Sequence, residues 1–107
     1  MSETRELTGP LLRIIQQTGT IAFRMQSGRV KVAGGWMHLC PEGTADILCF
    51  PRGLPVTWIE TKSPDGKTAK GRQESQADFR YRVEQIGHRY LRVTSIDEGL
   101  AALKGKG

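Results

Sequence analysis

Two apolar segments separated by a short turn constrain this chain more than any other feature. Residues 44–50 and 56–62 each read as a strand, and residues 51–55, with a proline at each end and a central glycine, turn the chain between them. We therefore expect an antiparallel pair. Because side chains alternate between the two faces of a strand, Glu60 and Lys62 are predicted to point to the same face, and the residues that precede each of them to the other.

Asp46 places a second carboxylate on the neighbouring strand. A lone aspartate on a strand is usually a solvated edge residue, but burying two acids without a counter-charge is costly. A divalent cation removes that cost and can activate an attacking water, so we favour a metal site at Asp46 and Glu60. Hard oxygen ligands suit Mg²⁺, with Mn²⁺ as a substitute, and the carbonyl of Thr61 can add a further ligand. This is the chemistry of a nuclease.

Lys62 and Gln76 are the other candidate catalytic residues. In isolation Lys62 would read as a surface lysine, whereas beside two acids its ammonium can orient the attacking water or stabilise charge developing on phosphorus. Gln76 lies three residues before Phe79, at the border of an apolar helical stripe. It is either a boundary residue or a donor that faces the sheet and bonds the water or a site ligand.

The other segments predict an α/β sandwich around one mixed sheet, in a single domain over residues 1–107. Helices are expected over residues 3–17 and 73–86, the second with Phe79, Val83 and Ile86 on its inner face, and from the capping box Ser95-Ile96-Asp97-Glu98 through Leu103. Further strands are expected over residues 20–25, 36–39 and 89–93. Residues 27–35 read as a hairpin turn or a flexible loop, and residues 63–72 as a polar loop. Gly9-Pro10 interrupts the first turn of the first helix, which places its start nearer Gly9.

The net charge of +5, from 16 Lys+Arg against 11 Asp+Glu, suits a polyanion such as DNA, although a solvated surface would show the same excess. Eight residues are candidate DNA contacts: Arg24, Ser27, Arg29, Lys31, Lys67, Lys70, Arg72 and Arg80.

Other kinds of site find little support in the sequence. Cys40 and Cys49 lack metal-ligand spacing and are expected to be reduced thiols. His38 and His88 have no neighbouring ligands, and Ser27 and Ser63 have no obvious base partner for a Ser-His-Asp triad. The absence of a signal peptide and of an apolar run long enough to cross a membrane predicts a cytoplasmic protein without a membrane partner.

Three motifs resemble the VRR-NUC (virus-type replication–repair nuclease) family of the PD-(D/E)xK superfamily. They are Pro41-Glu42-Gly43-Thr44-Ala45-Asp46, Ile59-Glu60-Thr61-Lys62 and Glu74-Ser75-Gln76. The resemblance implies a restriction-endonuclease-like α-β-β-β-α-β-α core and a Mg²⁺-dependent phosphodiester hydrolase. It places Asp46, Glu60, Lys62 and Gln76 in the motif positions. It also implies a metal-assisting glutamate on the first helix, for which Glu6 is the best match and Glu3 the second.

Short stand-alone members of the family look like phage or prophage proteins that act as homodimers on branched DNA, including four-way junctions. The resemblance therefore implies a homodimeric Holliday-junction resolvase. Two alternatives remain open: an endonuclease of the same fold that cuts flaps, nicked duplex or restriction sites, and a nucleic-acid-binding module without turnover.

Overall fold

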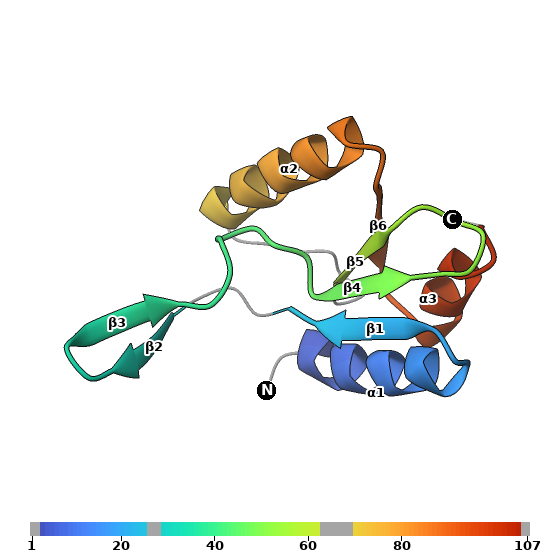
Figure 1. Ribbon diagram of the computed structural model, residues 1–107, viewed down its shortest axis with the longest axis horizontal. Coiled ribbons are helices and arrows are strands. Elements are labelled where there is room, and N and C mark those ends of the chain that lie inside the picture. The colour runs from blue at the N-terminus through green and yellow to red at the C-terminus, as the bar shows by residue number, and fades with distance from the viewer. Residues whose placement is uncertain (1–2, 26–28, 63–69, 106–107) are drawn as a thin grey trace.

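The computed structural model describes residues 3–25, 29–62 and 70–105, with the helices and strands shown in Figure 1. The side chains of residues 3–6, 29, 38 and 70–72 lie outside that description. The elements, in chain order, are α1 (Glu3–Gln17), β1 (Ile21–Arg24), β2 (Arg29–Val32), β3 (Gly35–His38), β4 (Ile47–Phe50), β5 (Thr57–Thr61), α2 (Lys70–Gln85), β6 (Arg89–Val93) and α3 (Ile96–Ala102).

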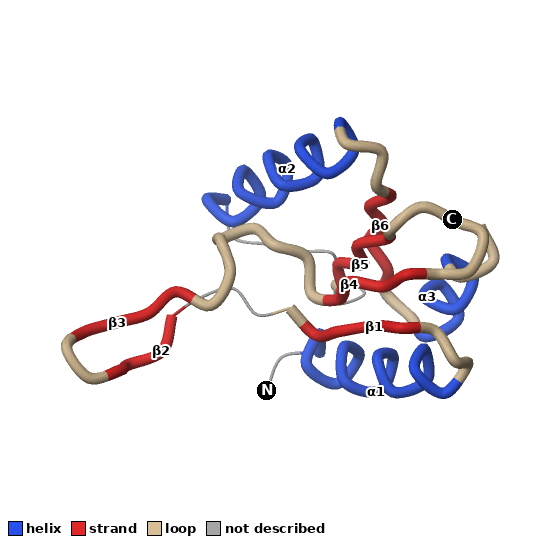
Figure 2. The backbone as a smooth tube through the Cα atoms, in the orientation of Figure 1, coloured by secondary structure: helices blue, strands red, loops and turns tan. Residues whose placement is uncertain are grey.

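Four strands form the central sheet in the order β1-β4-β5-β6 (Figure 2). β1 and β4 are antiparallel, as are β4 and β5, which confirms the pair expected around the turn at residues 51–55. β6 runs parallel to β5, because the connection through α2 returns the chain to the end of the sheet at which β5 begins. The predicted mixed α/β fold is therefore confirmed, and β2 and β3 form a separate hairpin inserted between β1 and β4.

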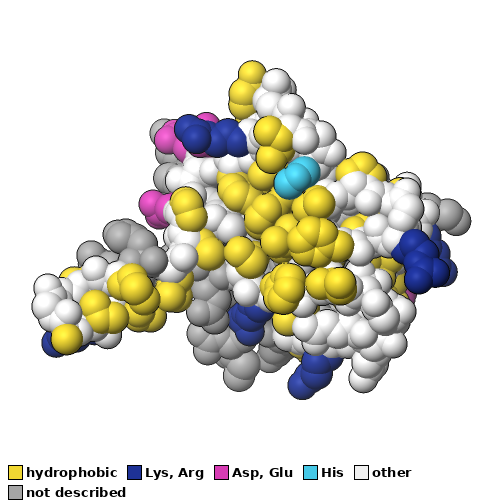
Figure 3. Space-filling model, viewed as in Figure 1, with side chains coloured by type: hydrophobic (Ala, Val, Ile, Leu, Met, Phe, Trp, Pro, Cys, Tyr) yellow, Lys and Arg dark blue, Asp and Glu magenta, His cyan; other side chains and the backbone are white. Residues whose placement is uncertain are grey.

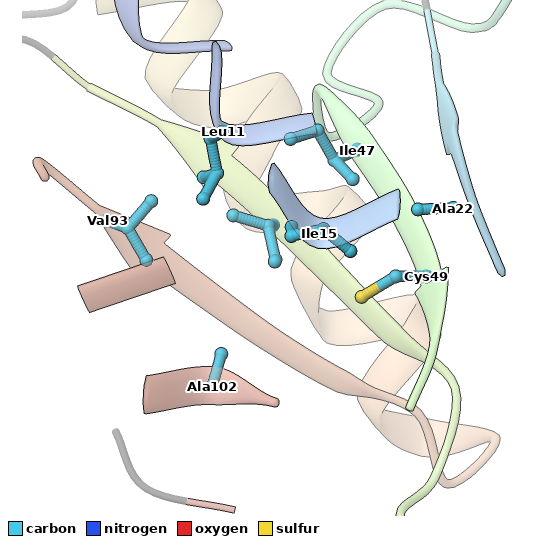
Figure 4. Close-up of a cluster of buried hydrophobic side chains, with 8 residues drawn as sticks. Leu11, Ile15, Ala22, Ile47, Cys49, Val93 and Ala102 are labelled. Carbon is cyan, nitrogen blue, oxygen red and sulfur yellow. The ribbon is translucent and has the colours of Figure 1, made fainter. Parts of the chain in front are cut away.

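The main core lies between the sheet and the two helices α1 and α3 (Figure 4). Its fully or almost fully buried members are Leu11, Ile15, Ala22, Ile47, Cys49, Ile59, Val93 and Ala102. The α1 residues Leu11 and Ile15 stand four apart and so share one helical face. Burial raises the pKa of the Cys49 thiol to about 11, so this thiol stays protonated at neutral pH. Cys40 and Cys49 are both free thiols, as expected.

α2 covers only part of the opposite sheet face. Phe79 of α2 packs edge-on against Trp58 of β5, with ring centroids 4.9 Å apart, and Val83 and Tyr90 belong to the same small cluster. Trp58 also donates its indole N–H to Nδ1 of His88 at 3.0 Å, so this histidine has a structural partner. Among the described residues, no helix packs closely on the β1–β4 half of this face.

Two predicted helix features differ from the structure. Gly9-Pro10 does not interrupt α1, which begins at Glu3 and contains Pro10. A proline costs a helix one N–H donor, and the burial of Leu11 and Ile15 just after it outweighs that loss. α2 begins at Lys70, so residues 70–72 are helical where a loop was expected.

Two further segments correct the prediction. Four residues of the expected loop at 27–35 are strand β2, which pairs with β3. Ile86 was expected on the inner face of α2, but it follows the helix and is 69% exposed. Gly87, with φ at 89°, turns the chain away there.

Candidate active site

Glu60 of β5 and Lys62, the residue that follows the strand, point to the same face, as strand alternation predicts. Both are almost fully buried, and the Lys62 ammonium lies 3.3 Å from Oε2 of Glu60. Ile59 and Thr61 point to the other face, where Ile59 joins the main core. A buried carboxylate without a counter-charge would be costly, so this ion pair stabilises the acid in place.

Gln76 is the residue by which α2 reaches the same carboxylate. Its side-chain amide donates to Oε2 of Glu60 at 2.8 Å, and the residue is 8% exposed. Gln76 stands three residues before Phe79 and seven before Val83, so it lies on the face of α2 that meets the sheet. Of the two sequence interpretations, the one in which Gln76 faces the sheet is confirmed.

Asp46 stands where β4 begins. Ile47 is paired with Ile59, so one further step along the antiparallel register brings Asp46 opposite Glu60. The Asp46 carbonyl accepts a backbone bond from Met25, which extends the β1–β4 ladder to this position. The two acids therefore occupy neighbouring positions on adjacent strands.

The Asp46 carboxylate is bound to the end of β5. Its Oδ2 accepts the backbone N–H of Thr61 at 2.9 Å and the Thr61 hydroxyl at 2.8 Å. The Thr61 hydroxyl also lies 2.5 Å from the hydroxyl of Thr8 on α1. These bonds join α1, β5 and the residue before β4 at one point, and no motif in the sequence singles out Thr8.

Asp46 and Glu60 are neighbours in the strand register, but their carboxylates have different partners: Glu60 contacts Lys62 and Gln76, whereas Asp46 bonds to Thr61. Two carboxylates against one ammonium leave one negative charge in excess among Asp46, Glu60 and Lys62. Such a set of hard oxygen donors is suited to a divalent cation. No group of three or more His, Cys, Asp or Glu side chains that could hold a metal occurs within the described part of the chain. The side chains of Glu3 and Glu6, the expected α1 contributors, lie outside the described residues.

Gly43 lets the segment before Asp46 approach α2. Its φ is +91°, and a side chain there would collide with the backbone of Ser75, the residue next to Gln76. Both the left-handed conformation and the close approach therefore require glycine. The contact fixes the distance between the segment that carries Asp46 and the helix that carries Gln76.

Tyr90 and Arg92 on β6 complete this face, and neither was predicted as a neighbour of the acids. Arg92 is the register partner of Glu60 and is exposed, and Tyr90 is the partner of Trp58. Burial and the nearby charge of Glu60 raise the pKa of Tyr90. Alternation in residues 89–93 would have put both on one face, but only the parallel register sets them beside Glu60.

The predicted DNA contacts have different environments. Arg24 and Lys31 are exposed. Arg80 pairs with Glu84 at 3.3 Å and its guanidinium lies 5.5 Å from the centre of the Tyr90 ring. Ser27 and Lys67 lie outside the described residues, as do the side chains of three others whose backbone is placed, namely Arg29, Lys70 and Arg72.

Comparison with known proteins bears on the fold. A solved structure described as a VRR_NUC domain matches 97% of this chain with 97% of its own, with a TM-score of 0.62 and 15% sequence identity. No family model and no curated protein matches the sequence. The chain thus has the fold of a VRR-NUC domain, as the sequence motifs predicted. None of the helices in the described ranges is long and apolar enough to cross a membrane.

Proposed function

We propose that this protein is a metal-dependent endonuclease that hydrolyses phosphodiester bonds in DNA. The observation that carries the proposal is the buried set Glu60, Lys62 and Gln76, assembled from the C-terminal end of β5 and from α2, with Asp46 opposite Glu60 in the extended β4–β5 register. Burying a carboxylate is costly, so one that is buried with two polar donors on one oxygen points to a functional site rather than to a structural core. The likeness to a VRR_NUC domain supports the same activity.

The donor set fits Mg²⁺. Asp46 and Glu60 would hold the ion, with the Thr61 carbonyl as a further ligand and Glu6, or Glu3, as the α1 contributor. When bound, such an ion supplies Lewis-acid polarisation of the scissile phosphate, and Mn²⁺ would substitute for it.

The other residues act on the nucleophile and the substrate. Lys62 sits 3.3 Å from Glu60, where its ammonium can orient an attacking water and stabilise charge developing on phosphorus. Gln76 holds the Glu60 carboxylate at 2.8 Å and so keeps its orientation fixed. The eight basic or polar positions from Arg24 to Arg80 would contact the phosphate backbone, which gives affinity without sequence preference.

The proposed substrate is branched DNA, with a four-way junction as the leading candidate and a homodimer as the acting species. Resolving a junction needs two cuts in two strands, which two copies of this site would supply. The β1–β4 half of the sheet face that α2 only partly covers supports self-association. Ile21, Phe23 and Phe50 expose 62%, 53% and 43% of their surface there. That the chain is one domain and works in the cytoplasm of a bacterial host, as a phage or prophage protein, stays a prediction.

Substitution of Asp46 by asparagine tests the chemistry. Asparagine keeps an oxygen that can accept the bonds from Thr61, so the fold should persist while the negative charge is lost. We expect cleavage of a labelled junction in Mg²⁺ to fall at least about 100-fold, with DNA binding largely retained.

Asp78→Asn is the matched control. Asp78 forms an exposed ion pair with Arg82 on α2, and loss of that pair should leave cleavage unchanged. Retained Mg²⁺-dependent cutting by Asp46→Asn, in a nuclease-free preparation, would refute the proposed role of Asp46.

A side-by-side assay of junction, flap, nicked duplex and linear duplex, with Mg²⁺ or EDTA, separates the alternatives. Preferential cutting of the junction supports a resolvase, and preferential cutting of a flap or nick favours the other endonuclease reading. Salt-sensitive binding with no cleavage of any substrate would favour the binding module instead.

A further inference from the structure

The β2–β3 hairpin projects from the body of the molecule at the end where the candidate active site lies (Figure 1). It is inserted between Arg24, the last residue of β1, and Asp46, the residue before β4. Both ends of the insertion therefore lie beside the proposed site. A two-stranded hairpin on its own is marginally stable in water, so a projecting one is more readily explained by a partner than by the fold.

The hairpin has two different faces. Lys31 is the cross-strand partner of Trp36, so these side chains share one face, and Val30 is the partner of Met37 on the other. Trp36 exposes 57% of its surface and Met37 51%. One face thus pairs a cation with a large aromatic ring, whereas the other is aliphatic.

We propose that the Lys31–Trp36 face binds an unpaired nucleotide of branched DNA, with the indole stacked on the base and the ammonium on a phosphate. Aromatic stacking with a lysine alongside is a chemistry by which proteins hold single-stranded nucleic acid. In an intact duplex both faces of every internal base are already stacked. The indole therefore finds a free base face only at a branch, bulge, gap or end, which makes the hairpin a reader of DNA structure rather than of sequence.

The position of the hairpin gives the recognition of an unpaired base a role in cleavage. Because it leaves the body between Arg24 and Asp46, a base held on Trp36 sets the path of the strand that enters the site. The hairpin would then decide how far from a branch the phosphodiester bond is cut. This role rests on the proposed function, since it requires that the protein act on DNA.

The test compares binding of a duplex that carries a bulge of unpaired bases with binding of the same duplex fully paired, in EDTA. We expect Trp36→Ala to lose about 5- to 100-fold in affinity for the bulged DNA and less than about twofold for the paired duplex. Trp36→Phe should retain most of the preference, because phenylalanine also stacks. A 2-aminopurine placed in the bulge should be quenched by the wild type and not by Trp36→Ala.

Met37→Ala is the matched control, since it truncates an equally exposed apolar side chain on the opposite face of the same hairpin. It should bind bulged DNA as the wild type does. An equal loss in Met37→Ala, or an unchanged bulge preference in Trp36→Ala, would overturn the stacking role.

The two proposals fail separately. If the wild type prefers bulged DNA through Trp36 but cuts nothing in Mg²⁺, the endonuclease proposal falls and the hairpin proposal stands. If the wild type cuts branched DNA and Trp36→Ala cuts the same bonds at the same rate, only the hairpin proposal falls.

Discussion

Glu60 is held by donors from two elements that come together only in the folded chain. Lys62 lies two residues away, just after the end of β5, whereas Gln76 belongs to α2, and both contact Oε2 of Glu60. Removing one donor from a buried carboxylate costs more than the net strength of one hydrogen bond, because the acid keeps its desolvation penalty. The orientation of Glu60 therefore depends on how closely α2 approaches the sheet.

Gly43 allows α2 to approach the segment before Asp46, so its substitution should destabilise the protein. Gly43→Ala and Gly53→Ala both place a side chain at positive φ, +91° and +76°, which costs about 1–2 kcal/mol in either case. At Gly53 the new methyl group meets nothing within 4 Å, whereas at Gly43 it collides with the Ser75 backbone. We expect Gly43→Ala to lower the free energy of unfolding by about 1–3 kcal/mol more than Gly53→Ala.

Urea titrations of the two variants measure this difference directly, since the conformational cost is common to both. Equal losses of stability would mean that Gly43 is not in close contact with the Ser75 backbone of α2.

Among the helices, α3 shows how a local motif fixes an element end. Ser95 accepts the backbone N–H of Glu98 at 3.1 Å, and the Glu98 carboxylate accepts both the backbone N–H and the hydroxyl of Thr94. These are the two halves of the predicted capping box. In an ideal box the glutamate would bond the backbone of the N-cap residue Ser95, whereas here it bonds Thr94, the residue before it. The cap starts α3 immediately after β6 and so holds Ala102 against the core.

Loss of this cap should weaken the protein in a pH-dependent way. The hydrogen bonds from Thr94 lower the pKa of Glu98 below its ordinary value of 4.5. Its stabilising contribution is therefore complete above pH 4.5 and is lost as the pH falls through the lowered pKa. We expect Glu98→Gln to cost up to about 1 kcal/mol of unfolding free energy at pH 7, and less under more acidic conditions.

Glu74→Gln, an exposed change on α2, is the control, and urea unfolding at several pH values gives the comparison. A difference between wild type and Glu98→Gln that stayed constant down to the acid limit would contradict the assigned cause.

The whole molecule has one covered sheet face and one that is only half covered. α1 and α3 bury the first, while on the second α2 packs against β5 and β6, and no other helix in the described ranges covers β1 and β4 there. Hydrophobic side chains gather over the centre of the face seen in Figure 3. Phe23 and Phe50 meet edge-on with centroids 6.4 Å apart, and with Ile21 they form what we term the sheet patch. An antiparallel sheet that faces water usually alternates to polar residues there.

Self-association through the sheet patch is the prediction at this scale. Sedimentation should show a species of twice 11.9 kDa for the wild type. Phe23→Ser should weaken the dimer at least about 10-fold, as expected for a central aromatic residue of an interface. Tyr81→Ser removes an aromatic side chain of similar exposure on α2, outside the sheet patch, and should leave the dimer intact. A wild type that sediments as a monomer, or an effect of Tyr81→Ser as large as that of Phe23→Ser, would contradict this assignment.

Local features of the sequence determined much of this fold. Alternation put Glu60 and Lys62 on one face at the end of β5, residues 51–55 implied the antiparallel β4–β5 pair, and the capping box marked α3. Each depends on neighbours within a few residues, so a periodicity or a turn motif is enough to predict it. The order of helices and strands apart from β2, and with it the VRR-NUC fold, follows from such signals.

Only the tertiary structure decided which distant residues meet. The contact of Gln76 with Glu60, the bonds from Thr61 to Asp46, and the place of Arg92 beside Glu60 depend on strand order and on a parallel register. The β2 strand was missed because its pairing with β3 outweighs a glycine-rich composition typical of a loop. Sequence periodicity specifies the face on which a side chain lies, but the neighbour across that face is set by packing between elements far apart in the chain.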